Sequence, residues 1–371
     1  MAMARPTQFL RGSIGAMARR EFRELVTIHP SDRPWQLPFA VAVAAGLPML
    51  LGAWFGEMSH MSYAALASVG AMAIVHVPST RLDHRMAVMM AVAFAMIACH
   101  AFGQLSQFAP LVRAPVITLV AVFATMACRY YRVGPPGSLF FVLAAAIGAY
   151  APGDAAHATT RLGVFALGSI GAVIVAFLYS LHILRSRAPS PMSPPPPPQA
   201  LLDSVVIDSL LVGLFVGLSL GAAQILELEK PYWVPVSCLA VIQGVNLRAV
   251  WNRQAHRILG TMIGLAATWM LARYAAGPWT VAVAITVLTF CVEAAIVRHY
   301  GFAVVLVTPL TILLAEVSTL GHAGSSMLIA ARFADTVLGS LLGLAGGFCL
   351  HHAVLRRWLR QWLGGADPSG P

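Results

Sequence analysis

Residues 332–348 read R-F-A-D-T-V-L-G-S-L-L-G-L-A-G-G-F, and residues 161–177 read R-L-G-V-F-A-L-G-S-I-G-A-V-I-V-A-F. Each stretch is a long apolar run that begins with an arginine and contains many small residues. A shift of 171 positions places Arg161 on Arg332, Leu167 on Leu338, Gly168 on Gly339, Ser169 on Ser340 and Phe177 on Phe348. The alternative is chance matching in an Ala-, Gly- and Leu-rich sequence. Because the surrounding apolar runs also align, we interpret the pair as an internal duplication.

The composition identifies the broad class of protein. Of 371 residues, 58% are hydrophobic and only 10% are charged, and the mean hydropathy is +0.77. Soluble domains carry about 25% charged residues, so this chain has too few charges to cover a water-facing surface. We therefore predict an all-α integral membrane protein whose main partner is the lipid bilayer.

Twelve apolar runs are candidates for membrane-spanning helices, and they form two groups of six. The first group is 37–56, 62–77, 86–103, 110–128, 138–150 and 161–184, and the second is 203–224, 233–245, 256–274, 278–297, 301–320 and 332–355. A spanning helix needs about 20 apolar residues, and several runs reach this length only with their flanks. A count of ten or eleven spans is therefore an alternative.

Five segments follow from this pattern. They are a basic amino-terminal segment, the first repeat, a linker, the second repeat and a cytoplasmic tail: residues 1–36, 37–184, 185–202, 203–355 and 356–371. In the first segment, apolar residues between positions 10 and 26 share one helical face, which suits a helix lying on the inner leaflet. The linker contains five consecutive prolines at 194–198, which favour a stiff extended spacer.

The distribution of basic residues predicts the orientation in the membrane. The net charge is +10, but the arginines sit at the ends of apolar runs, which argues against a nucleic-acid partner. If the amino terminus is cytoplasmic and all twelve runs cross, nineteen of the 24 basic residues lie on the inner side. This bias agrees with the positive-inside rule. Both termini are then cytoplasmic, and two six-helix repeats share one orientation.

Short or interrupted apolar runs at matching places in two repeats often mark a transport path. The second runs of both groups, 62–77 and 233–245, are short, and Pro235 is expected to interrupt the latter. The fifth runs also match, since 138–150 is short and 301–320 contains Pro309. Unwound backbone at these places would face a ligand. The alternative is that short spans simply tilt little or pack at an edge.

Two acidic residues in apolar runs are candidates for proton coupling, because charge in hydrocarbon is costly and often functional. Glu293 lies in the tenth run, where a structural pair with Arg298 is the alternative. Asp335 lies in the twelfth run, three residues after Arg332, and the two could pair with each other on one helical face. Arg161 has Val164 in place of that aspartate.

Enzymatic motifs are not evident in the sequence. We find no phosphate-binding loop, nucleophile elbow or zinc-protease helix, so we expect no enzyme, no catalytic residues and no cofactor. The five cysteines sit inside apolar runs without paired metal-ligand spacing, and we expect small core residues and no metal site.

Three motifs in the second half carry a family resemblance. They are P-Y-W-V-P at 231–235, R-I-L-G-T-M-I-G at 257–264 and R-F-A-D-T-V-L-G at 332–339. Together they resemble the fusaric-acid-resistance (FUSC) family, whereas the first half matches weakly. The resemblance implies a bacterial inner-membrane protein tied to efflux of aromatic carboxylic acids, and more distantly plant anion channels. Many relatives have a large cytoplasmic domain where this chain has only the proline linker.

The resemblance and the charges lead to one main functional hypothesis. We expect an exporter of small organic anions, such as aromatic carboxylates, driven by the proton gradient. The expected substrate-binding residues are Arg257, Arg332, Arg161, Tyr232 and Trp233, and the expected proton-coupling residues are Glu293 and Asp335. A passive anion channel and a non-transporting envelope scaffold are the alternatives. Assembly as a homo-oligomer is compatible with the sequence.

Overall fold

The computed structural model describes residues 27–28, 30–56, 58–151, 155–191, 205–272, 277–315 and 325–362. Two features considered above lie outside these ranges: the amino-terminal helix expected within residues 10–26 and the prolines at 194–198. Within the described ranges the regular structure is helical.

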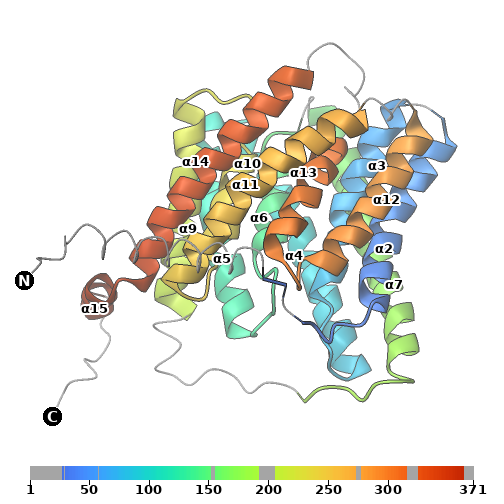
Figure 1. The fold of residues 1–371 in the computed structure, drawn as a ribbon, viewed down its shortest axis with the longest axis horizontal. Helices are drawn as coiled ribbons and strands as arrows, with labels where there is room; N and C mark the ends of the chain where they lie inside the picture. Colours follow the sequence, from blue (N-terminus) through green and yellow to red (C-terminus); the bar gives the residue numbers. More distant parts are fainter. Residues whose placement is uncertain are drawn as a thin grey trace, which may run out of the picture.

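Twelve of the described α-helices correspond in order to the twelve apolar runs, with gaps in the numbering where the chain is not described (Figure 1). Those of the first half are α2 (Gln36–Trp54), α3 (Met58–Ala71), α4 (Leu82–Ser106), α5 (Pro110–Tyr130), α6 (Leu139–Ala149) and α7 (Ala158–Ile183). Those of the second half are α9 (Asp208–Ile225), α10 (Trp233–Ile242), α11 (Leu247–Ala272), α12 (Pro278–Ala295), α13 (Tyr300–Ala315) and α14 (Ser325–His351). The described part of the chain also contains the 3₁₀ turns η1 (Met72–His76) and η2 (Ala155–His157), and the helix α15 (Ala353–Trp362).

Seven of the described helices are long and apolar enough to cross a membrane, namely α2, α4, α5, α7, α9, α12 and α14. The helices α6, α10 and α13 are apolar but shorter. The chain is thus a multi-pass membrane protein. Twelve crossings stay a prediction, because α10 has ten residues and at 1.5 Å per residue covers about half of a 30 Å hydrocarbon layer.

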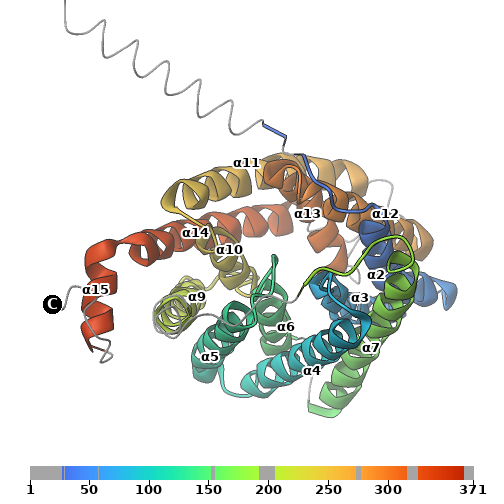
Figure 2. The ribbon, with the colours of Figure 1, turned by 90° about the horizontal axis from the view of Figure 1, so that it is seen from below.

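The same helix pairs pack together in the two halves. In the first half α3 packs on α7 and α4 on α6, and in the second half α10 packs on α14 and α11 on α13. The halves also meet reciprocally, since α5 packs on α9 and α12 packs on α2 (Figure 2). Each contact has its counterpart six helices along the chain. This is the arrangement that two tandem repeats in one orientation would give.

Two glycines let these pairs approach closely. A Cβ on Gly168 of α7 would overlap the Ala67 carbonyl of α3, and a Cβ on Gly339 of α14 would overlap the Val234 carbonyl of α10. Helices in lipid gain little from hydrophobic burial against one another, so close backbone approach is the usual source of contact energy. The glycines occupy matching positions in the shifted sequences, and so do the helices that they contact.

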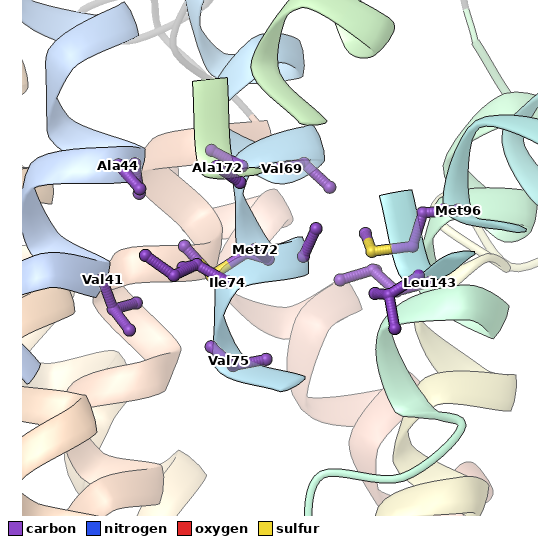
Figure 3. Close-up of a cluster of buried hydrophobic side chains, with 14 of the residues drawn as sticks. Val41, Ala44, Val69, Met72, Ile74, Val75, Met96, Leu143 and Ala172 are labelled. Carbon is purple, nitrogen blue, oxygen red and sulfur yellow. The ribbon is translucent and has the colours of Figure 1, made fainter. Parts of the chain in front are cut away.

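The second helix of each half is enclosed by the others. Side chains of α3 and η1 form a buried apolar cluster with α2, α4, α6 and α7 (Figure 3), whose labelled members are Val41, Ala44, Val69, Met72, Ile74, Val75, Met96, Leu143 and Ala172. In the second half all ten residues of α10 are buried. The short helices are therefore central elements of the bundle, not edge elements.

Two expectations about proline were wrong. Pro235 does not interrupt α10, because it is the third residue of that helix and the amides of a first turn have no intrahelical acceptor to lose. The helix α13 likewise continues through Pro309. The last run also differs from its expected bounds, since α14 ends at His351 and a separate helix α15 follows.

Candidate functional site

The short helix α10 forms the centre of the candidate site. It packs most closely against α14 and also contacts α9, α6 and α11, so both halves of the chain surround it. Trp233 begins the helix and Ser237 lies one turn further along. Arg332 of α14 contacts Trp233, and Arg257 of α11 contacts Ser237.

Arg332 of α14 is the first of these arginines. It is only 5% exposed, and its guanidinium lies over the Trp233 ring at 3.9 Å from the ring centroid. This distance is that of a cation–π contact, which stabilises a cation that has lost its water. Its Nε and Nη1 atoms have no hydrogen-bond partner in the described part of the chain. Two strong donors are thus buried and unsatisfied.

Arg257 of α11 is the second. It is 7% exposed, and its Nη2 donates a long hydrogen bond of 3.3 Å to the Ser237 hydroxyl. Its Nε has no partner among the described residues. The positive charges of Arg257 and Arg332 repel each other. The structure therefore brings together two arginines that are 75 positions apart in the sequence.

Asp335 lies on α14, fully buried. Neither of its carboxylate oxygens has a hydrogen-bond partner within the described ranges. Its charge interacts with that of Arg332, but the ion pair allowed by their helical spacing does not form. The carboxylate is therefore near Arg332 but makes no hydrogen bond to it.

Aromatic side chains extend from this site to the neighbouring helices. The ring of Tyr232, the residue before α10, lies 5.2 Å from Trp233 and 6.1 Å from Tyr150 at the end of α6. The guanidinium of Arg113, on α5, lies 4.7 Å from the Tyr150 ring centroid. A continuous row of rings thus joins Arg113 to Arg332.

Sequence reasoning did not select Arg113 or Tyr150. Both residues lie at ends of apolar runs in the first half, where the family resemblance is weak. The sequence does place a basic residue, Arg113, and an aromatic residue, Tyr150, at the same end of two neighbouring apolar runs, and this pattern could have indicated them. Nothing in that pattern indicates that Tyr150 meets Tyr232, because the contact depends on how the two halves pack.

Arg161, the counterpart of Arg332 in the first half, has different surroundings. It is buried on α7, and its charge acts on His100 of α4. The His100 ring stacks on Phe165 with ring centroids 4.4 Å apart. The structure therefore places Arg161 in a first-half cluster with a histidine, whereas Arg332 has a tryptophan and an aspartate.

Glu293 is engaged in an ion pair. Its Oε2 accepts a hydrogen bond of 2.8 Å from Nη2 of Arg33, and its backbone carbonyl accepts another from Nη1 of the same arginine. Arg298, the partner considered above, donates instead to the Ala294 carbonyl. The pair fixes the segment that precedes α2 to the end of α12. Among the described residues, no three His, Cys, Asp or Glu side chains gather in a way that could hold a metal ion.

Comparison with known proteins finds a family match in the second half of the chain. Residues 218–346 match the sequence model of the family described as "Fusaric acid resistance protein-like". The second half of the chain thus resembles this family. The fusaric-acid-resistance-like region runs from α9 to α14 and contains Tyr232, Trp233, Arg257, Glu293, Arg332 and Asp335. It does not include Arg113, Tyr150 or Arg161.

A curated relative also matches part of the chain. It is the "Uncharacterized membrane protein YvaC" of Bacillus subtilis (strain 168), which is 32% identical over 145 residues. These residues are 38% of this chain and 23% of the relative, so the similarity covers less than a quarter of that protein. No solved structure matches this chain. The resemblance expected from the three motifs is confirmed for the second half.

Proposed function

We propose that this protein is a membrane transporter that exports small organic anions through a site at α10. The observation that carries the proposal is the pair of buried arginines, Arg257 and Arg332, with guanidinium donors that nothing in the described chain satisfies. A buried charge is costly unless it is paired and hydrogen-bonded. Two such charges that interact with each other favour the binding of an anion, and a carboxylate suits the guanidinium fork.

The aromatic row supports an aromatic carboxylate as the substrate. Trp233, Tyr232 and Tyr150 offer stacking surfaces between Arg332 and Arg113, and aromatic rings gain from offset or edge contacts with one another. An aromatic acid would place its carboxylate between the arginines and its ring among these side chains. Arg113 would attract the anion at the far end of the row.

Asp335 is the group that we favour for proton coupling. An inward proton gradient drives export only if the proton and the substrate anion occupy the site in turn. We propose that Asp335 releases its proton to the cytoplasm before the anion binds to Arg257 and Arg332, and that it takes up a proton from the outer side after the anion has left. Glu293 is the second candidate, but its ion pair with Arg33 favours a structural role. Export would then be driven by the proton gradient.

The proposed architecture is two tandem six-helix repeats in one orientation, with twelve spans in a bacterial inner membrane. Its support is the matching of helix pairs between the halves and the excess of arginine that the sequence predicts for the cytoplasmic side. Arg161 would be the repeat counterpart of Arg332 in this arrangement. The lipid bilayer and the organic anion are the partners that we propose.

The test is the flux of a labelled aromatic carboxylate from proteoliposomes, with and without an imposed pH gradient. We expect Arg257→Gln and Arg332→Gln each to weaken transport by about tenfold or more, because each removes a buried charge-assisted contact. Arg298→Gln makes the same chemical change at an exposed position and should transport normally. If both buried arginines tolerate neutralisation, the site is not at α10.

The variant Asp335→Asn separates the exporter from a passive channel. Asparagine cannot take up or release the proton, so we expect this variant to lose the effect of the pH gradient while downhill flux persists. Coupling between two ligands usually changes affinity by about 5- to 150-fold, which sets the size of the expected loss. Gradient-independent downhill flux in the wild type would instead indicate an anion channel. Absence of flux across a panel of acids would favour the scaffold.

A further inference from the structure

The helix α15 lies apart from the candidate site and crosswise to the bundle. It is seen end-on in Figure 1, where α14 runs down to it, and it lies in the plane of view in Figure 2, where α9 is seen end-on. It occupies the same end of the bundle as the entry into α2 (Figure 1). A helix in this position would run parallel to a membrane surface.

The sequence of α15 has two distinct faces. Its ten residues read A-V-L-R-R-W-L-R-Q-W. With 3.6 residues per turn, the apolar side chains fall on one continuous face and the three arginines on the opposite one: Val354, Leu355, Trp358, Leu359 and Trp362 against Arg356, Arg357 and Arg360. Lipid-surface helices have this combination of a basic face with a tryptophan-containing apolar face.

Contacts with the bundle fix the orientation of α15. Nη2 of Arg356 pairs with Oδ1 of Asp208, the first residue of α9, at 3.2 Å. The other oxygen of Asp208 pairs with Arg129 of α5 at 2.8 Å. Leu359 packs against a small buried cluster that includes Leu350. One carboxylate thus ties α15 to the ends of two other helices.

Part of the apolar face is left uncovered. Val354, Trp358 and Trp362 are exposed, with 59%, 58% and 73% of their surface accessible. A ten-residue helix is about 15 Å long, and three side chains offer far less than the roughly 800 Å² per partner that a stable protein interface buries. Tryptophan is enriched where hydrocarbon meets water. These properties match a lipid surface better than a second protein.

We propose that α15 is an interfacial helix that binds anionic lipid headgroups. Trp358 and Trp362 insert among the acyl chains, while Arg357 and Arg360 attract phosphate-bearing headgroups with net negative charge. Basic residues near a negatively charged leaflet are attracted strongly at short range, and salt screens the attraction. The inference does not depend on the proposed transport activity.

The test uses the full chain reconstituted in phosphatidylcholine vesicles that contain an equal mole fraction of either brominated phosphatidylglycerol or brominated phosphatidylcholine. Bromine on the acyl chains quenches nearby tryptophans. The chain has eight tryptophans, so the difference between wild type and a Trp358→Phe/Trp362→Phe variant isolates the signal of α15. We expect both lipids to quench this signal, phosphatidylglycerol more strongly, with the excess lost at high salt.

A matched pair of variants tests the role of charge. Arg357→Gln/Arg360→Gln should reduce the preference for phosphatidylglycerol by roughly tenfold. Arg81→Gln/Arg298→Gln removes two charges from other exposed helix ends and should preserve the preference. Equal quenching of the wild type by the two lipids would refute headgroup recognition. Absence of quenching by either lipid would show that the face does not enter the bilayer.

Discussion

At the scale of single residues, the contact between Glu293 and Arg33 can have a structural role or a role in proton coupling, and simple variants distinguish the two. The two residues are 260 positions apart, and their side chains are only 10% and 18% exposed. The pair joins the segment before α2 to the end of α12. Its geometry is that of a structural bond, with the carboxylate and the backbone carbonyl of Glu293 both held by one guanidinium.

We expect Glu293→Gln and Arg33→Gln to lower the apparent unfolding temperature by similar amounts. Breaking a buried ion pair costs about 3–5 kcal/mol, and the partial exposure of Arg33 reduces our expectation to about 1–3 kcal/mol. The double variant should lose little more than either single one, because the contact is already absent. Thermal unfolding in detergent measures these changes.

Transport in proteoliposomes provides the second readout for the same variants. If the pair is structural, folded Glu293→Gln protein keeps its response to a pH gradient. Loss of that response with unchanged stability would make Glu293, and not Asp335, the coupling residue.

At the scale of helices, close packing between α10 and α14 holds Arg332 and Asp335 at the site. Gly339 faces the Val234 carbonyl without space for a side chain, so the backbone of α14 is as near to α10 as it can be. Arg332 and Asp335 lie within two turns of this contact. Their position relative to Trp233 and Ser237 therefore depends on a residue that carries no chemistry.

Gly339→Ala is expected to push the helices apart, whereas Gly163→Ala is a matched control on α7. A Cβ at Gly163 meets nothing within 4 Å, and alanine is the better helix former there. Overpacking usually costs about 1–3 kcal/mol, so we expect Gly339→Ala to unfold at a lower temperature and to transport poorly. Equal unfolding temperatures for the two variants would mean that α14 can shift without cost.

At the scale of the whole molecule, the central question is how a ten-residue helix contributes to the topology. An α10 of about 15 Å spans half of the hydrocarbon layer, and its ends continue into non-helical chain. Such chain is tolerated at membrane depth only where protein encloses it. All of α10 is buried by its neighbours, so a crossing at this place is physically allowed.

Single cysteines on either side of α10 test that crossing. The five native cysteines would be replaced, and Leu226→Cys and Val245→Cys introduced one at a time at exposed positions. We expect a membrane-impermeant maleimide to label position 226 in intact cells and position 245 only after permeabilisation. Labelling of both from the same side would make α10 re-entrant and remove a span from the predicted twelve.

The amino-acid sequence by itself determined the class of the protein and most of its elements. Low charge and high hydropathy require a bilayer, and each described spanning candidate coincides with a predicted apolar run, because apolar length is a local property of the chain. The three motifs of the second half were also sufficient to indicate the family resemblance, since they are local patterns too.

The tertiary structure alone decided which residues meet. Arg257 and Arg332 converge on α10, Glu293 pairs with Arg33, and Tyr150 joins the aromatic row through contacts between helices far apart in the sequence. Apolar runs that are hydrophobic on all sides carry little information about which neighbours they face, because lipid and protein offer them similar surroundings. The choice among neighbours comes from close approach at glycines such as Gly339 and from buried polar groups, and these act only in the assembled bundle.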